Sequence, residues 1–290
     1  MGDFVVFTDS TTDLPVGYAK ELELEIINFT YTIDGKEYSN HLDHRELSTQ
    51  EFYVLLKEGK IATTSLITAD RFVKTFEPFI KGGKDILYLC FSSGASGSYS
   101  QAVVAADELA ETYPGSKLIV IDSLCASMGQ GLLAHYAVTE KRKGRTIGEV
   151  ADYIRKLVPS LAHWVTVDDL VHLKRGGRVS GATAIVGSLL GIKPIIHLDD
   201  EGRLIPVDKV RGRQKSLEYL AEKMRETIVE PKNQIVFISH GNSPEDAAKL
   251  ADLIKKKIGT ETFIINDIGP VIGAHSGPGT IALFFIASKR

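Results

Sequence analysis

The sequence predicts an α/β fold in two domains, the first built on a mostly parallel sheet with helices on both faces. Two unbroken apolar runs, residues 85–91 and 117–122, alternate with helical patterns, which is typical of strands buried on both faces of a parallel sheet. The length of 290 residues also suits two domains. Because the pattern changes after Pro159, we expect one domain at 1–160 and a smaller mixed-sheet α/β domain at 161–290.

Local signals define the elements of the first domain. Asp34-Gly35 lies between alternating apolar and polar residues, which is a strong hairpin signal. Ser48 and Thr146 each have a Glu three residues later, and this capping-box spacing begins a helix. The predicted elements are strands 4–10 and 22–29, the hairpin 28–38, helix 50–59, a loop at 60–68, helix 72–81, strands 85–91 and 117–122, and helix 147–157.

The second domain mixes strands and helices less regularly. A hairpin turning near 200–202 and several apolar runs indicate a mixed sheet. The other predicted elements are strand 163–167, a short helix at 168–177, a small-residue helix at 181–191, helix 215–228, strand 234–241, helix 245–259, strand 261–267, a Gly-rich loop at 268–279 and strand 280–288.

Composition excludes some classes of protein and compartment. A formal net charge of -3 gives no basic field that would attract nucleic acid. Cys90 and Cys125 offer neither a disulfide framework nor metal-ligand spacing, which favours a reducing cytosol and no metal site. The first residues lack a signal-peptide pattern, and no apolar run reaches the ~18 residues of a membrane span. We therefore expect a cytoplasmic protein without stable membrane insertion.

A Ser/Gly loop at 92–98 joins a predicted strand to a predicted helix. Ligands of open α/β sheets bind beyond the carboxyl ends of strands, where a helix N-terminus offers free N–H groups. Hydroxyls add donors, and glycines let the backbone approach a ligand closely. This loop therefore favours anion binding only modestly over simple capping of the helix. Its small residues are Ser92, Ser93, Gly94, Ser96, Gly97 and Ser98.

Three further segments supply polar groups of the same kind. Thr64 and Ser65 precede a helix, His275 and Ser276 lie among glycines, and Lys174, Arg175 and Arg178 flank Gly176-Gly177. Each has a structural alternative: a helix cap, a structural histidine, or a solvated helix end. Together, hydroxyls, an imidazole and guanidinium groups suit recognition of a carboxylate or a phosphate.

Other functions are less well supported by motifs. The phosphate loop G-x-x-x-x-G-K-[ST] and the dinucleotide fingerprint G-x-G-x-x-G after the first strand are absent, which disfavours a nucleotide or sugar-phosphate binder. The segment SSGASG does not have G-x-S-x-G spacing. A serine hydrolase that uses Ser93 with His275 as base remains an alternative, because sequence cannot show their geometry.

The order of the motifs resembles the DegV family of fatty-acid-binding proteins. The motifs are FTDSTTDLP at the start, TTS at 63–65, SSGASGSYSQA at 92–102, IDS at 121–123, LKRGGRVSG at 173–181, IKPI at 192–195 and GPVIGAHSGPG at 269–279. The resemblance implies two α/β domains with a long-chain fatty acid in a tunnel between them.

The resemblance also implies a set of site residues. The carboxylate would be bound by Thr64 or Ser65 and by Ser93, with Ser92 and Gly94 beside them. His275, next to Ser276, matches the family's head-group histidine, and Arg175 and Arg178 match its basic loop. After TTS this chain has Leu66-Ile67, where the family usually has Gln-Pro. Such a change bears on the tunnel mouth and on chain-length preference.

The resemblance implies a partner as well. In that family a separate kinase, which binds ATP and Mg²⁺, phosphorylates the bound carboxylate to an acyl phosphate. This chain would then be a carrier subunit without a cofactor or complete activity of its own, and His275 and Arg175 would support phosphoryl transfer. Burying a CH₂ gains ~0.8 kcal/mol, so a palmitate-length tail would gross roughly 10 kcal/mol before ordering costs.

A basic segment follows the predicted hairpin of the second domain. Alternation along an extended chain would place four side chains on one face. Such a patch would suit an acidic surface of the kinase, although a solvated hairpin exit is nearly as well supported. The four residues are Lys209, Arg211, Arg213 and Lys215.

Overall fold

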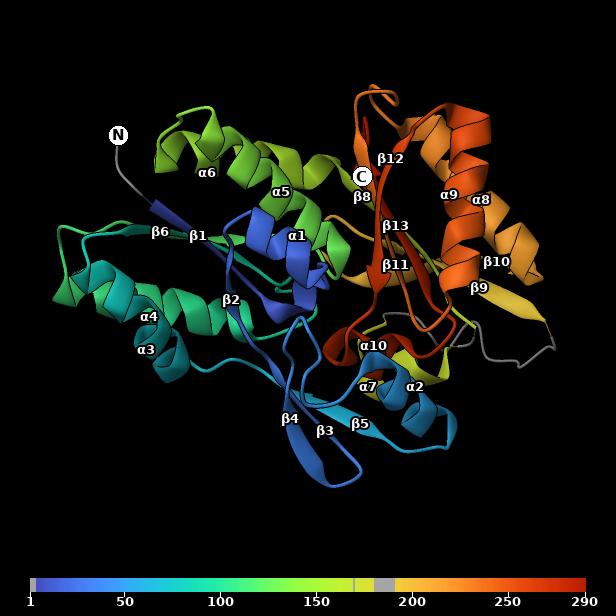
Figure 1. Cartoon of the computed structure of the whole chain (residues 1–290), viewed down its shortest axis with the longest axis horizontal. Helices are drawn as coiled ribbons and strands as arrows, with labels where there is room; N and C mark the ends of the chain where they lie inside the picture. The colour runs from blue at the N-terminus through green and yellow to red at the C-terminus, as the bar shows by residue number, and fades with distance from the viewer. Residues whose placement is uncertain (1–3, 169, 180–190) are drawn as a thin grey trace.

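The computed structural model describes residues 4–168, 170–179 and 191–290 and confirms the predicted α/β class. A parallel sheet of order β2-β1-β6-β7 forms the centre of the first half of the chain. Figure 1 shows α3 and α4 on one face of this sheet and α5 and α6 on the other. The elements are β1 (Phe4–Asp9), α1 (Val16–Glu21), β2 (Glu25–Ile27), α3 (Ala69–Lys81), β6 (Asp85–Cys90), α4 (Ser98–Thr112), β7 (Leu118–Asp122), α5 (Met128–Arg142) and α6 (Ile147–Leu157).

A small antiparallel sheet of order β4-β3-β5 lies beside the parallel sheet. The hairpin between β3 (Thr30–Ile33) and β4 (Lys36–Ser39) turns at Asp34 and Gly35, which both have positive φ, as predicted. The helix α2 (Thr49–Lys57) starts at the predicted capping box.

One predicted loop is wrong in this small sheet. Residues 62–65 form the strand β5 (Ala62–Ser65), which pairs with β3. Its four side chains are small and only Ala62 is apolar, so it lacks the alternation of apolar residues that marks a strand in sequence. The β-branched Thr63 and Thr64 nevertheless suit the extended ladder.

The second half of the chain forms a six-stranded mixed sheet of order β10-β9-β8-β13-β11-β12. β11 and β12 are parallel, and the other neighbours are antiparallel. The elements are β8 (Leu161–Thr166), α7 (Val171–Gly176), β9 (Ile192–Leu198), β10 (Leu204–Arg211), α8 (Arg213–Thr227), β11 (Ile235–His240), α9 (Pro244–Ile258), β12 (Thr262–Asp267), α10 (Pro270–Ser276) and β13 (Ile281–Ile286).

The Gly-rich segment near the end of the chain differs from the prediction. We expected a loop over 268–279, but Pro270 begins the helix α10, which ends before Gly277. Proline suits the first turn of a helix, and Gly277 adopts a positive φ of 78° at its end. The predicted small-residue helix at 181–191 falls, except for Gly191, outside the described residues.

The helix α5 lies between the two main sheets and joins their cores. Its Leu132 and Leu133 are fully buried in one cluster with Phe237 and Phe284 of the second sheet. The strand β8 begins at Leu161, directly after a 3₁₀ turn that contains Pro159. Among the described residues, no helix is long and apolar enough to cross a membrane.

Candidate functional site

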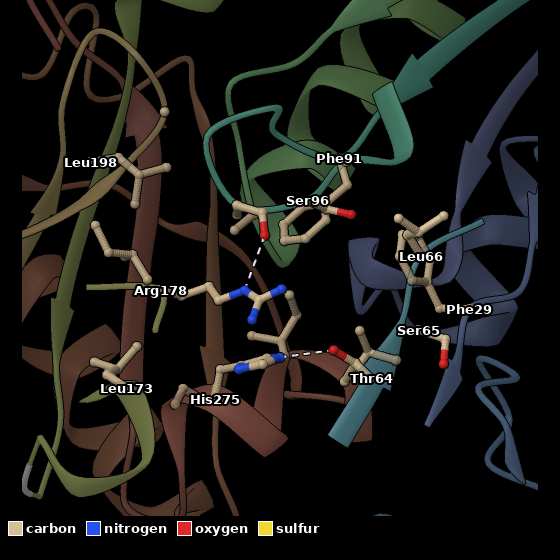
Figure 2. Close-up of a pocket in the computed structure, with 18 residues that line it drawn as sticks. Phe29, Thr64, Ser65, Leu66, Phe91, Ser96, Leu173, Arg178, Leu198 and His275 are labelled. Atoms are coloured by element: carbon tan, nitrogen blue, oxygen red, sulfur yellow. Dashed lines mark hydrogen bonds between the residues drawn. The ribbon is translucent and has the colours of Figure 1, made fainter. Parts of the chain in front are cut away.

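A cavity of about 200 Å³ opens where β5, the loop after β6, α7 and α10 meet. We call it the mouth cavity (Figure 2). Both halves of the chain contribute to its wall. Its polar lining residues are Thr64, Ser65, Ser96, Arg178, His275 and Ser276, and its larger apolar ones are Phe29, Leu66, Phe91, Leu173, Leu198, Leu204, Val271 and Ile272.

Contacts between the two halves of the chain fix the polar groups of the mouth cavity. Thr64 Oγ1 lies 2.9 Å from His275 Nε2, which links β5 to the end of α10. Arg178 donates through Nε to the Ala95 carbonyl at 3.2 Å and through Nη1 to the Gly176 carbonyl at 2.6 Å. In Figure 2 the guanidinium group lies beside the imidazole ring, and Thr64 faces that ring. The guanidinium group, the imidazole ring and the Thr64 hydroxyl thus form a donor-rich corner of the mouth cavity.

The charge of this corner is positive. Burial, and secondarily the charge of Arg178, lowers the pKa of His275 to about 4, so the ring is neutral at pH 7. Arginine stays protonated at any working pH. Because Arg178 donates to two neutral carbonyls of the described residues, these bonds leave its charge uncompensated. The mouth cavity is therefore suited to an anion.

A second cavity of about 50 Å³ continues the mouth cavity inward. We call it the inner cavity. It lies against one face of the second sheet and beneath the start of α5. The two cavities share the wall residues Ala126, Leu173, Leu198, Leu204, Ile272 and Ser276.

The wall of the inner cavity is apolar although it includes polar residues. Ser127 donates its hydroxyl proton to Asp13 Oδ2 at 2.6 Å, away from the cavity. Thr280 Oγ1 lies 2.9 Å from the carbonyls of Ser276 and Gly277. His163 places one ring nitrogen 3.3 Å from the Leu161 carbonyl. These contacts leave aliphatic and aromatic carbon facing the space.

Strand register gives the order of the residues along one wall of the inner cavity. Val167 follows β8, Val165 pairs with Ala282, and His163 pairs with Phe284. Four residues of strand span roughly 13 Å, so Val167 and the His163–Phe284 pair lie at opposite ends of this wall. The His163 and Phe284 rings pack edge to face with centroids 5.1 Å apart. This pair forms one end of the wall.

The structure brings together five of the residues expected in the site. Thr64, Ser65, Arg178, His275 and Ser276 all line the mouth cavity. Ser276 has a buried hydroxyl with no hydrogen-bond partner among the described residues.

Four other expected residues do not line the mouth cavity. Ser92 is fully buried and donates to the Gly202 carbonyl at 2.9 Å. Ser93 and Gly94 are exposed and border a separate depression with Asp200, Glu201 and Arg203. Arg175 is exposed on α7. The serine that lines the mouth cavity from the Ser/Gly loop is Ser96.

Sequence reasoning took Ser96 for a possible cap because it directly precedes a helix. Ser96 does accept a hydrogen bond from the Ser98 backbone at 3.2 Å, and it also lines the cavity. Phe91 was missed as well. It directly follows β6, so the rule that ligands bind beyond the carboxyl ends of strands could have identified it.

The expected basic patch has a different geometry. The strand β10 ends at Arg211, and Gly212, with a φ of 94°, turns the chain into α8. Arg213 therefore leaves the alternation and pairs with Asp168 at 2.5 Å and Asp246 at 3.1 Å. The prediction that all four cations share one face is wrong. Lys209 and Arg211 remain exposed on β10.

Comparisons with known proteins agree with this architecture. A family model described as "Uncharacterised protein, DegV family" matches residues 3–288. A DegV domain-containing protein of Clostridium perfringens is 42% identical over 290 residues, which is 100% of this chain and 99% of that protein.

Two solved structures have the same fold over nearly their whole length. A fatty-acid-binding DegV family protein from Thermus thermophilus is 27% identical, with 98% of this chain and 99% of the other covered and a TM-score of 0.89. DegV, a fatty acid binding protein from Bacillus subtilis, is also 27% identical, with 99% and 100% covered and a TM-score of 0.84. With the family model and the Clostridium relative both matching almost end to end, this chain belongs to the DegV family.

Proposed function

We propose that this protein binds a long-chain fatty acid, with the carboxylate in the mouth cavity and the tail in the inner cavity. The observation that carries this proposal is the change in chemistry along one continuous space. Cationic and hydroxyl groups line its outer part, and carbon lines its inner part. A fatty acid has the same division, and two solved relatives are described as fatty-acid-binding proteins.

The carboxylate has suitable donors within the mouth cavity. A charged group taken out of water needs hydrogen-bond partners, and bonds to guanidinium are among the strongest. Arg178 offers the positive charge, and Thr64 and Ser96 offer hydroxyls. The neutral ring of His275 adds a donor only in the tautomer that carries the proton on the nitrogen facing the ligand.

We further propose that the bound acid is presented to a partner kinase. A carboxylate oxygen would attack the γ-phosphorus of ATP, which the partner holds with Mg²⁺. This attack would convert the bound fatty acid to an acyl phosphate and release ADP. The position of the head group at the outer end of the space supports this proposal. We expect His275 and the exposed Arg175 to contribute more to phosphoryl transfer than to lipid affinity.

Mass spectrometry of ligand released from the purified protein tests the lipid proposal directly. We expect fatty acid in near-stoichiometric amount, and saturable binding when a delipidated sample is titrated with cis-parinaric acid. A sample that carries no fatty acid and shows no saturation would contradict the proposal.

The hydrolase alternative is not favoured by the geometry. Ser93 and His275 line different depressions, and Thr64 lies against the imidazole where a nucleophile would be needed. A fluorophosphonate probe should therefore leave Ser93 unlabelled. Stoichiometric labelling of Ser93 would instead support the function of a serine hydrolase.

A further inference from the structure

The tip of the β9–β10 hairpin, residues 198–204, reaches from the second domain to the Ser/Gly loop of the first. Ser92 Oγ donates to the Gly202 carbonyl at 2.9 Å and accepts from the Gly94 backbone N–H at 3.1 Å. One buried hydroxyl therefore connects the loop to the hairpin. We call Ser92, Gly94 and Gly202 the clasp.

The clasp depends on close backbone approach. A Cβ on Gly94 would lie 2.5 Å from the Glu201 carbonyl oxygen, closer than real Cβ atoms come. A Cβ on Gly202 would collide with Ser92 Oγ, and the φ of 69° at Gly202 also favours glycine. Two glycines on facing segments thus allow the domains to meet here.

Beyond its own hairpin pairing, the tip is supported by a bridge between Leu204 and Val179 and by the buried side chain of Leu198. The ladder between β8 and β9 runs from Thr166↔Ile195 to Trp164↔His197, and in the described structure it stops there. The tip itself is braced, because Asp199 Oδ1 accepts from the backbone N–H groups of Glu201 and Arg203 at 3.0 and 2.8 Å. It therefore overhangs the sheet as a stiff unit.

The same tip forms a wall of the ligand space. Leu198 and Leu204 line both cavities, and Gly202 lines the mouth cavity. Movement of the tip away from Ser92 would open the space along its side.

We propose that Ser92 is a positioning residue, and that opening of the clasp sets the rate at which ligand enters and leaves the cavities. The inference rests on the proposed lipid binding, since it assigns the exchange step of that same site. Ser92 acts through the hairpin tip and does not contact the ligand.

Stopped-flow exchange of cis-parinaric acid tests the proposal. Loss of one buried hydroxyl bond should favour the open tip, so Ser92→Ala should release and take up the probe about five- to tenfold faster. Because entry and release accelerate together, Kd should change by less than about twofold. Gly94→Ala, which pushes the tip outward, should act in the same direction.

Ser93→Ala is the matched control, since Ser93 is exposed and its hydroxyl is not part of the clasp. It should exchange like the wild type. An unchanged release rate in folded Ser92→Ala, or an equal acceleration in Ser93→Ala, would overturn the proposal.

Hydrogen exchange of the wild type covers the case in which Ser92→Ala does not fold. Amides of residues 199–204 should exchange faster than those of β13 and slow when fatty acid is bound. Exchange as slow as that of β13 in the free protein would also overturn the proposal. If the wild type fails to bind cis-parinaric acid, lipid binding itself fails, while the comparison of amides in the free protein still tests the clasp.

Discussion

Asp13 illustrates how burial controls a single charge in this protein. Its side chain is buried, accepts from the Gly269 backbone N–H at 2.9 Å and from the Ser127 hydroxyl at 2.6 Å, and lies at a positive φ of 50°. Burial raises the pKa of Asp13 from 3.8 to about 8, against the lowering effect of these two bonds. The carboxyl group is thus largely protonated near neutral pH.

Stability should therefore depend on pH through Asp13. Between its unfolded and folded pKa values, the folded state holds more protons than the unfolded state, so stability falls as pH rises, by up to about 1.4 kcal/mol per pH unit. Asp13→Asn keeps an oxygen that accepts from the Gly269 N–H, replaces the other oxygen with an NH₂ that can donate to Ser127 Oγ, and tolerates a positive φ. Urea unfolding between about pH 5 and pH 8 should show a shallower decline for this variant.

Asp70→Asn is the control for that comparison, because Asp70 is exposed and paired with Lys74. It should keep the wild-type slope. Parallel curves for Asp13→Asn and the wild type would show that Asp13 does not titrate in this range.

Arg178 and Arg175 separate head-group binding from surface charge. They are three residues apart, both exposed, and only Arg178 lines the mouth cavity. Loss of a charged hydrogen bond at a partly solvated site should make Arg178→Gln bind cis-parinaric acid about tenfold more weakly. Arg175→Gln should bind like the wild type. Equal losses in a fluorescence titration would assign the effect to general charge.

At the scale of elements, the inner cavity depends on one face of the second sheet. Phe284 and Phe285 are adjacent on β13 and both buried, but Phe284 faces the inner cavity and Phe285 faces the core beneath α8 and α9. The alternation of a strand thus provides two equivalent rings with different neighbours.

Chain-length preference should respond to Phe284 alone. Phe284→Leu shortens a side chain that lines the inner cavity and leaves room for a longer tail. Each further buried CH₂ gains ~0.8 kcal/mol, so the affinity ratio of stearic to palmitic acid should rise by up to about tenfold. Phe285→Leu should leave the ratio unchanged. A competition titration that gives the same ratio for Phe284→Leu and the wild type would show that Phe284 does not limit the length of the tail.

Sequence predicted the elements whose signals are local and not those that depend on neighbours. The capping boxes at Ser48 and Thr146 and the turn at Asp34-Gly35 each act within a few residues, and all three form as predicted. The strand β5 and the helix α10 are defined instead by pairing with β3 and by packing against other elements.

For the site residues too, sequence predicts what is encoded locally and not what depends on contacts with distant segments. The resemblance and residue types identified Thr64, Arg178 and His275, which do meet. Which serine of the Ser/Gly loop faces the cavity depends on where the hairpin tip lies. The tip covers Ser92 and leaves Ser96 on the cavity wall, and no local spacing encodes that contact.

For the whole molecule, single hydrogen bonds around the mouth cavity cross between the halves of the described chain. They include the bonds that join Thr64 to His275, Ala95 to Arg178, Ser92 to Gly202 and Ala126 to His163. The shared core around α5 holds the two sheets together, whereas these contacts are single hydrogen bonds. The ligand space therefore lies at the more easily opened part of the interface.

A partner kinase would approach a molecule of net charge -3, so local positive charge should steer it. Lys209 and Arg211 are two positions apart on β10, which places them on one side of the strand, and both are exposed. Arg213 is excluded from this surface by its pairs with Asp168 and Asp246. We therefore propose Lys209 and Arg211 as the revised docking surface for the proposed kinase partner.

Charge reversal at these two positions should slow association with the kinase while preserving lipid binding. Rim charges act mainly on the association rate, so Lys209→Glu with Arg211→Glu should lower it by about tenfold at low salt and flatten its salt dependence. Lys74→Glu with Lys81→Glu makes the same change of charge on α3, far from β10 in Figure 1. Surface plasmon resonance should show wild-type association for this control. If both double variants slow association equally, net charge alone governs the encounter, and β10 carries no docking surface.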